Sequence, residues 1–520
     1  MTEEELPSGW AWATIADIAS FISRGRAPRY TDDSGVPVIN QRCIRWRGID
    51  EQFLKFTEES AVASLRHEYI LRTGDVLWNS TGTGTLGRAA IFSGLASERS
   101  AVVDTHVTVV RPNGYEPRLL HYWIMSPAIQ DQIEEMQTGS TNQVELPRKT
   151  IEATGIPVPP ANEQRRIVER IDELFSQIEA GEAALARAKR LLARYRQAVL
   201  KAAVTGELTR DWRERHQAEI EPATHLLTRI IQARREAWEK AELEKLKAKG
   251  KPPKDDNWKK KYKEPEHPDT TNLPKLPEGW VWASIEQVSH FVTSGSRGWK
   301  EFYSSEGAIF VRAQNIKTDA LVLDDVAYVS VPHNSEGTRT KIDLNDVLIT
   351  ITGANVTRTA LVDQPLQEAY VNQHIALVRP VEKQNAVFMH LSLIAEDHGR
   401  AQLLARAYGA GRPGLGLTDV EAVVIPVAPL GEAIEATEVC RAIISELNAA
   451  ERDIAAEVRR AAALRQAILT AAFAGKLVPQ DPADEPAASL LDQISAERLT
   501  TPNTKPRRGR PPKAAAIAAQ

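Results

Sequence analysis

The sequence contains little cysteine, no long apolar run and no large excess of charge of either sign. Cys43 and Cys440 are its only cysteines, which excludes a disulfide framework and suits a reducing cytosol. No stretch approaches the ~20 consecutive apolar residues that a membrane-spanning helix needs. The chain starts with an acidic segment, Met1–Glu5, that is unlike a signal peptide. These features predict a cytoplasmic protein without a membrane segment.

The common motifs of catalytic and metal sites are also missing. The sequence has no P-loop, no H-E-x-x-H, no C-x-x-C and no Asn-Pro-Pro-Tyr-like tetrapeptide. Gly82–Gly87 matches the dinucleotide pattern G-x-G-x-x-G, but Arg88–Phe92 indicates a strand where that site needs a helix. A glycine-rich β-turn is the favoured interpretation, and His106 and His374 are interpreted as structural. We therefore predict no catalytic residue, no metal ligand and no cofactor of its own.

Composition describes an ordinary folded chain. The 520 residues leave room for roughly three domains, and a hydrophobic share of 42% is enough for each to bury a core. The formal net charge is −4. Because DNA-binding proteins are usually basic, this sum argues mildly against nucleic acid, unless basic side chains gather on one face.

The sequence does contain a long internal repeat. Leu6–Ile15 (LPSGWAWATI) returns about 270 residues later as Leu276–Ile285 (LPEGWVWASI). Further matching pairs are Gly74–Leu77 with Asn345–Leu348, Gly87–Arg88 with Thr357–Arg358, His106 with His374, Arg111–Pro112 with Arg379–Pro380, Ile156–Pro160 with Ile425–Pro429, and Arg196–Ala203 with Arg465–Ala472. A unit of this length is a whole domain plus a helix, far longer than a solenoid repeat. The repeat predicts a pseudo-symmetric molecule that reads two similar things.

The chain divides into six predicted segments. They are a mixed α/β globule at 1–160, a long helix at 161–208, a charged helical extension with a linker at 209–275, a second globule at 276–429, a second long helix at 430–478, and a tail at 479–520. Lys245–Lys263 is lysine-rich and poorly apolar, which predicts a mobile linker. The tail is expected to be mostly disordered apart from a short helix near Leu490. Its Arg508–Pro511 (RGRP) resembles an AT-hook, although a basic tail that binds phosphate loosely is an equal alternative.

Both long helices have apolar or small residues at spacings of three and four. In the first helix these are Ile171, Leu174, Ile178, Gly181, Leu185, Ala188, Leu192, Tyr195, Val199 and Ala202, and in the second Cys440, Ile443, Leu447, Ala450, Ile454, Glu457, Ala461, Leu464, Ile468 and Ala471, where Glu457 is the exception. We call these positions the seam. A seam held over more than four heptads predicts that the helices pair with each other as an antiparallel coiled coil. The alternative is two independent amphipathic helices, each packed on its own globule.

The polar loops of the two globules are rich in side chains that suit DNA. Arginine reads guanine, asparagine and glutamine read adenine, and serine, threonine and lysine hold phosphates. The candidate residues are Arg24, Arg26, Arg29, Tyr30, Arg42, Arg45, Arg47, Asn79, Thr141, Asn142, Arg148 and Lys149 in the first globule, and Arg297, Trp299, Lys300, Arg312, Gln314, Asn315, Asn355, Arg358 and Arg412 in the second. Each residue alone could be an ordinary solvated loop residue. Their matching positions in two repeats favour two DNA readers for two different half-sites.

The order of these motifs resembles the specificity subunits of type I restriction–modification systems. The motifs that carry it are Leu-Pro-x-Gly-Trp at 6–10 and 276–280, Gly74–Leu77 with Asp346–Leu348, Ile156–Pro160 leading into Glu163–Val168, and Ala202–Leu208 with Ala471–Leu477. The resemblance covers nearly the whole chain. It implies an α+β fold in which two α/β target-recognition domains are joined by two long helices that form an antiparallel coiled coil with pseudo-two-fold symmetry.

The resemblance also implies partners and a division of labour. Each target-recognition domain would read half of a bipartite asymmetric site on double-stranded DNA, with the coiled coil as a ruler. The helices would dock two methylation subunits that use S-adenosylmethionine, and restriction subunits that use ATP and Mg²⁺ would complete the nuclease. The chain itself would be non-catalytic. Two alternatives are an enzyme that recognises and cuts DNA alone, and a coiled-coil scaffold without a DNA role.

Overall fold

The computed structural model describes residues 6–26, 29–32, 35–139, 144–295, 298–317, 319–331, 338–409 and 413–500. The chain divides into two compact units. Unit 1 comprises Met1–Leu185 and Ala455–Gln520, and unit 2 comprises Ala186–Ile454. Each unit therefore contains one globule and one half of each long helix.

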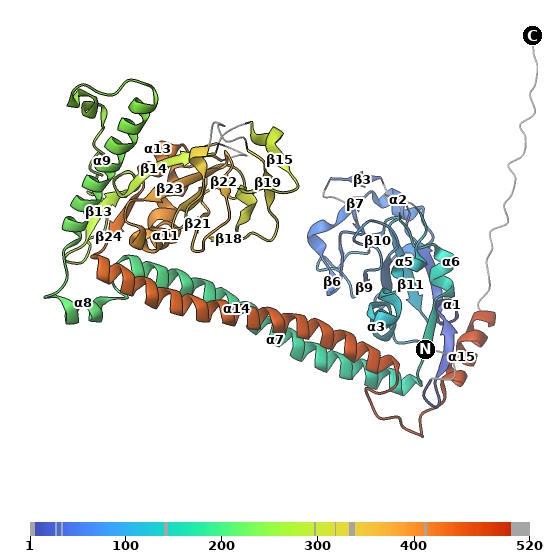
Figure 1. The fold of residues 1–520 in the computed structure, drawn as a ribbon. Coiled ribbons are helices and arrows are strands. Elements are labelled where there is room, and N and C mark those ends of the chain that lie inside the picture. Colours follow the sequence, from blue (N-terminus) through green and yellow to red (C-terminus); the bar gives the residue numbers. More distant parts are fainter. Residues whose placement is uncertain are drawn as a thin grey trace, which may run out of the picture. The chain divides into compact units, whose positions relative to one another are not determined.

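Unit 1 contains an α/β globule (Figure 1). Its elements are β1 (Ala11–Thr14), α1 (Ile15–Ile18), β2 (Ala19–Arg24), β3 (Tyr30–Thr31), β4 (Val36–Ile39), β5 (Ile44–Arg45), β6 (Gly48–Ile49), β7 (Lys55–Thr57), α2 (Glu59–Ala63), β8 (Val76–Asn79), β9 (Ala89–Ile91), β10 (Val102–Val103), β11 (Val107–Pro112), α3 (Pro117–Met125), α4 (Pro127–Gln130), α5 (Ile133–Met136), α6 (Arg148–Ala153) and β12 (Gly155–Val158). The main sheets have the orders β2-β11-β8-β9 and β10-β4-β7-β3. β11 lies in the interior of its sheet and is buried on both faces, as its continuous apolar run predicts. α3 begins with Pro117 after the Glu116 cap and covers the sheet with Leu119, Leu120 and Ile124.

Unit 2 repeats this layout. Its globule contains β13 (Val281–Ser284), α10 (Ile285–Val288), β14 (Ser289–Ser294), β15 (Tyr303–Ser304), β16 (Ala308–Val311), β17 (Ile316–Lys317), β18 (Ala320–Leu321), β19 (Ala327–Val329), β20 (Val347–Thr350), β21 (Thr359–Leu361), β22 (Ala369–Val371), β23 (Ile375–Pro380), α11 (Ala386–Ile394), α12 (Ala401–Arg406), α13 (Leu417–Glu421) and β24 (Val424–Val427). The sheet orders β14-β23-β20-β21 and β15-β19-β16-β22 mirror those of unit 1. The repeat thus encodes the same fold twice, and the predicted α+β class is confirmed.

A buried tryptophan ties each globule to the start of a long helix. In unit 1 the indole Nε1 of Trp10 donates to Glu163 Oε2 at 3.0 Å. In unit 2 the Trp280 Nε1 donates to Glu432 Oε2 at 2.8 Å. β1 and β12, and likewise β13 and β24, pair antiparallel beside these contacts. The repeated Leu-Pro-x-Gly-Trp motif therefore has a structural explanation. Its tryptophan holds a glutamate, Glu163 or Glu432, in the first turn of the long helix.

The two long helices are α7 (Ala161–Val204) and α14 (Leu430–Phe473), which lie side by side (Figure 1). In unit 1, Arg465 lies 3.2 Å from Glu182. In unit 2, Arg196 lies 3.2 Å from Glu451. From the first contact to the second the α7 residue number rises from 182 to 196 while the α14 number falls from 465 to 451, so the helices pair antiparallel as predicted. α7 ends before Gly206, whose φ of 73° provides the left-handed residue of a helix C-terminus.

Most positions of the predicted seam are buried or half-buried, but Gly181, Tyr195 and Leu464 are exposed. Ile171, Val199, Leu447 and Ile468 are buried, and Leu174, Ile178, Leu185, Leu192, Ile443 and Ile454 are half-buried. Tyr195 is 54% exposed and Leu464 is 50% exposed. The residues that follow them, Arg196 and Arg465, face the partner helix instead. The reason is that 3.6 residues per turn drift against a seven-residue repeat, so a long helix changes which residue faces its partner.

The segment between the repeats is more ordered than its composition predicts. It contains α8 (Arg210–His216), α9 (Ala223–Ala248) and a 3₁₀ helix at Asp256–Lys261 that packs back against α9. The expected helix of the tail is α15 (Ala487–Thr500). The RGRP segment lies outside the described residues. No described helix is both long and apolar enough to cross a membrane.

One buried ion pair recurs in the core of each globule. In unit 1, Arg111 Nη2 donates to Asp75 Oδ2 at 2.7 Å, and the Asp75 side chain is 1% exposed. In unit 2, Arg379 Nη2 donates to Asp346 Oδ2 at 2.7 Å. Each aspartate also accepts from a backbone N–H three residues before it, at Arg72 and Asp343. The pair therefore fixes the turn before β8 and before β20.

Replacing Asp75 with alanine is expected to lower the free energy of unfolding of unit 1 by about 3–5 kcal/mol. The substitution leaves the Arg111 guanidinium buried without its counter-ion. Urea unfolding followed by circular dichroism measures the loss, and Glu59→Ala, an exposed carboxylate on α2, is the control with an expected change within about 0.5 kcal/mol. Equal effects of the two substitutions would contradict a structural role for the pair.

Candidate nucleic-acid interface

Four loops of unit 1 meet at one edge of the globule. They are the chain after β2, the chain after β8, the turn before β11 and the segment before α6. The backbone N–H of Ser80 donates to the carbonyl of His106 at 2.9 Å, and that of Leu146 donates to Ser80 at 2.8 Å. The backbone N–H of Gly25 donates to Val107 at 3.2 Å. We call this set of loops the loop edge.

Unit 2 builds its loop edge with two equivalent backbone bonds and a third from the matching glycine to a different residue. The N–H of Ile351 donates to His374 at 2.9 Å, and that of Leu415 donates to Ile351 at 2.8 Å. The N–H of Gly295 donates to Asn372 at 3.2 Å. A threonine hydroxyl contacts the histidine Nδ1 in each unit, which supports the structural interpretation of both histidines. The frame of the edge is therefore repeated, whereas the side chains that it displays differ.

A glycine opens the first loop in each unit because the backbone passes too close for a side chain. A Cβ at Gly25 would lie 2.0 Å from the carbonyl oxygen of Val103. A Cβ at Gly295 would lie 2.1 Å from that of Val371. Both glycines therefore let the loop that follows β2 or β14 lie directly against the neighbouring chain, so that the next residues stand at the edge.

The loop edge of unit 1 contains a hollow of about 450 Å³ lined by candidate arginines. Arg24, Arg26 and Arg148 surround it, together with Tyr69 and Glu145. Arg26 lies over the Tyr69 ring at 5.0 Å and is exposed, so its guanidinium is held without an acidic partner among the described residues. Arg24 is different, because it donates to Glu145 at 3.0 Å and braces the loop. Arg148 also has an internal partner, because its Nε donates to Glu152 at 2.6 Å. Of the three arginines at this hollow, only Arg26 has no acidic partner among the described residues.

A second hollow of about 300 Å³ in unit 1 contains Tyr30 and Arg42. Arg42 is exposed and lies over the Phe53 ring at 4.5 Å. The Tyr30 hydroxyl donates to Asp104 at 3.3 Å. Burial, with the nearby Asp104 carboxylate, raises the pKa of Tyr30 to about 12, so the phenol is neutral and remains a hydrogen-bond donor. Arg29 is exposed before β3, and Lys149 is exposed in α6.

In unit 2, three candidates contact the turn at Asp325. Arg312 and Gln314 contact the Asp325 side chain at 3.5 and 3.1 Å. Asn315 donates to the Asp325 carbonyl at 2.8 Å. Lys300 is exposed, and Asn355 and Arg358 are half-buried in the turn after β20. The sequence alone does not show which of these candidates contact the Asp325 turn and which do not.

Several candidates are corrected by burial or by an internal partner. Asn79 is fully buried and donates to the carbonyls of Gln41 and Thr85, each at 3.1 Å. Asn315 is 2% exposed, and Trp299 is 5% exposed inside an aromatic cluster. These three side chains cannot reach a base in this conformation. Arg45 pairs with Asp50 at 3.5 Å, and Arg47 forms an ion pair with Glu182 of α7.

Four candidates, Thr141, Asn142, Arg297 and Arg412, lie outside the described residues. Sequence reasoning also missed Tyr69, which lines the first hollow and supports Arg26. The acidic residues Asp104 and Glu145, which line the two hollows, were not predicted either, because a carboxylate does not bind the phosphate backbone. About 40 residues separate Tyr69 from Arg26 in the sequence, so no local pattern indicates that the two side chains are in contact.

Within the described part of the chain, no three His, Cys, Asp or Glu side chains are placed to hold a metal ion. The hollows of unit 1 are lined by hydrogen-bond donors, guanidinium groups and aromatic rings. Such groups bind phosphates and base edges.

Comparison with known proteins relates the first globule to a described domain family. Residues 7–188 match the family described as "Type I restriction modification DNA specificity domain". The EcoKI specificity subunit of Escherichia coli K12 is 21% identical over 524 aligned positions, which cover 97% of this chain and 99% of that protein. The chain contains a type I restriction–modification DNA specificity domain at residues 7–188, and it is similar over nearly its whole length to a specificity subunit of such a system. The matched domain and these relatives support a subunit for sequence-specific DNA recognition.

Other similarities agree with this assignment. The EcoBI specificity subunit of Escherichia coli is 25% identical over 379 residues, covering 71% of this chain and 69% of that protein. A solved structure titled "Structural basis underlying complex assembly and conformational transition of the type I R-M system" superposes with a TM-score of 0.62 at 17% identity. The superposition covers 91% of this chain and 99% of the chain in that structure. The two chains therefore share one fold.

Proposed function

We propose that each globule reads one half of a bipartite, asymmetric DNA site through its loop edge. The observation that carries the proposal is the contrast within the repeat. The two globules share their Trp–Glu and Asp–Arg pairs and two backbone bonds at the loop edge, but the loop edges display different side chains. A common frame with different contact groups is what two different half-sites require.

α7 and α14 are proposed to set the gap between the half-sites and to dock two methylation subunits. In each unit an arginine of one helix bonds an acidic residue of the other, which favours one antiparallel register over its neighbours. With a fixed register, the length of the helix pair sets a constant gap between the half-sites. Dimer geometry fixes half-site spacing in other DNA-binding proteins in the same way.

The chemistry is assigned to partner subunits. The methylation subunits would use S-adenosylmethionine to methylate adenine, and restriction subunits would use ATP and Mg²⁺ for cleavage. This chain would be the non-catalytic member of a cytoplasmic complex on double-stranded DNA. Methylation or cleavage of DNA by the purified chain alone would favour the alternative of a self-contained enzyme.

Arg26→Ala is expected to weaken binding by about 1–3 kcal/mol and to relax the preference at one position of one half-site. Arg26 lines the hollow at the loop edge, where a guanidinium supported by Tyr69 is available to a base. The matched control is Arg66→Ala, because Arg66 also lies over the Tyr69 ring, at 5.9 Å, but is absent from the hollow. Fluorescence anisotropy on duplexes with single substitutions measures both. A larger loss for Arg66 than for Arg26 would contradict the assigned face.

Selection from a randomised duplex library tests the proposal as a whole. The purified complex of this chain with its methylation subunits should enrich two short sequences separated by a constant gap. Recovery of unrelated duplexes without a shared sequence would contradict DNA reading and favour a scaffold.

A further inference from the structure

A folded basic hairpin extends from the globule of unit 2. The first half of α9 is part of the core, where Leu226 and Ile230 are buried. Beyond Arg234 the helix leaves the core, and the chain turns at Gly250, whose φ is 67°. It then returns as the 3₁₀ helix Asp256–Lys261. We call residues 234–264 the lysine hairpin.

Aromatic rings hold the two arms of the hairpin together. Trp238 of α9 stacks on Trp258 with ring centroids 6.2 Å apart and an interplanar angle of 21°. Trp238 also contacts the Tyr262 ring at 5.3 Å. The Tyr262 hydroxyl accepts from Arg234 at 2.7 Å. These contacts make the hairpin a built element rather than a loose linker.

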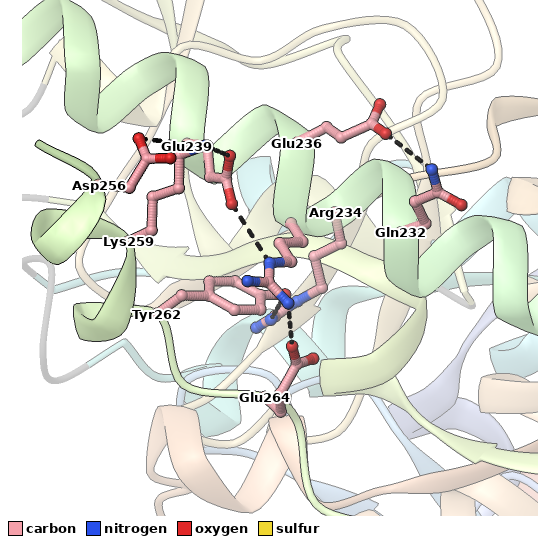
Figure 2. Close-up of polar contacts among 9 residues, drawn as sticks. Gln232, Arg234, Glu236, Glu239, Asp256, Lys259, Tyr262 and Glu264 are labelled. Atoms are coloured by element: carbon pink, nitrogen blue, oxygen red, sulfur yellow. Dashed lines mark hydrogen bonds and ion pairs between the residues drawn. The ribbon is translucent and has the colours of Figure 1, made fainter.

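Several acidic side chains of the hairpin are used internally, as Figure 2 shows. The contacts are Arg235–Glu239 at 3.2 Å, Arg235–Glu264 at 3.2 Å, Lys259–Glu239 at 3.5 Å, Lys259–Asp256 at 3.5 Å and Lys245–Glu242 at 3.2 Å. They neutralise Arg235, Lys245 and Lys259. The remaining lysines are left to its outer surface.

The outer surface is strongly basic. Residues 245–263 contain nine lysines and two aspartates, a formal charge of 9 − 2 = +7 in a chain whose net charge is −4. Seven of these lysines are exposed and form no ion pair with a described residue, namely Lys247, Lys249, Lys251, Lys254, Lys260, Lys261 and Lys263. So many like charges on one folded element repel each other, and an external polyanion relieves that repulsion.

The chemistry of the surface favours a phosphate backbone over a protein. Protein interfaces depend on buried apolar or aromatic anchors and are depleted in lysine. None of the large hydrophobic side chains exposed in the described chain lies between Tyr195 and Phe291, and the hairpin's own rings pack on one another. Lysine binds phosphate as a point charge, and duplex DNA carries one charge per ~1.7 Å of its axis.

We propose that the lysine hairpin is a second DNA contact of this subunit, separate from the loop edges, that holds the phosphate backbone without reading bases. The inference rests on the proposed function for its ligand. It assigns to the hairpin the sequence-independent part of the affinity and to the loop edges the sequence-dependent part.

The test uses the complex of the full chain with its methylation subunits. One variant changes Lys249, Lys251, Lys260 and Lys261 to glutamine, and its matched control changes the same four residues to arginine. Anisotropy measures binding to the selected duplex and to a scrambled duplex over a range of salt concentrations. The glutamine variant should bind both duplexes more weakly by the same factor. Its slope of log affinity against log salt should become shallower by up to about 3.6, at roughly 0.9 per phosphate contact, whereas the arginine variant should match the parent chain.

Each other outcome overturns the inference. An unchanged salt slope would mean that the hairpin does not contact phosphate. Loss of preference between the two duplexes would mean that it reads bases, and loss of a methylation subunit from the complex would mean that it docks a protein. Failure of the proposed function is a separate result, since the parent complex would then bind both duplexes equally whatever the hairpin variants do.

Discussion

Exchanging residues 15–154 for the matching segment of another specificity subunit changes one half-site and leaves the other half-site and the gap unchanged. This segment contains the whole loop edge of unit 1. It leaves Trp10 and Glu163 in place, so the tie between globule and α7 is retained. Mismatched base pairs cost about 1–3 kcal/mol each, so two of them lower modification of the original site by at least roughly thirtyfold. Sequencing of methylated host DNA measures the result.

The donor segment must keep the aromatic contacts with the long helices. Tyr122 packs on Phe175 with centroids 5.6 Å apart, and Trp123 packs on Phe473 at 4.8 Å. The reciprocal exchange of residues 285–423 is the matched control and should alter only the other half-site. A chimera that changes both half-sites, or neither, would show that the two globules do not read independently.

Inserting one heptad into α7 after Lys189 and one into α14 after Val458 is expected to lengthen the gap by roughly three base pairs. Seven helical residues add ~10.5 Å, and successive base pairs are ~3.4 Å apart. The two insertions lie between the Glu182–Arg465 contact and the Arg196–Glu451 contact, so both are kept. Each half-site should stay the same, because neither loop edge is altered.

The control places the same seven residues between Lys254 and Asp255, in the lysine hairpin. That change lengthens the chain but not the helix pair, so the gap should remain constant. Library selection with each complex provides the measurement. An unchanged gap after the paired helix insertion would show that α7 and α14 are not the ruler.

Much of the fold could be predicted because repeated residues carry it. Trp10 and Trp280 occur in one motif, and each proves to anchor a glutamate at a helix start. The heptads predicted two paired helices, yet misplaced Tyr195 and Leu464, since periodicity does not reveal where a straight helix drifts against its partner. The lysine-rich linker was predicted as mobile from composition. Trp238 and Trp258 stack across a turn, and such a contact has no signal in local sequence.

The site was less predictable than the fold. A polar loop shows which residues are capable of binding DNA, but not which of them face inward. Asn79 satisfies two carbonyl groups inside the globule, and Asn315 does the same beneath a turn. Arg26 and Arg42 differ from them because an aromatic ring holds each at the surface. These distinctions depend on contacts between distant segments, so only the structure separates them.

The methylation pattern of the host genome, mapped with this gene present and deleted, tests the central claim most directly. The account predicts methylated adenines in one asymmetric motif, made of two short sequences with a constant gap, and predicts that this methylation disappears with the gene. A genome whose methylated motifs are the same with and without the gene would contradict it.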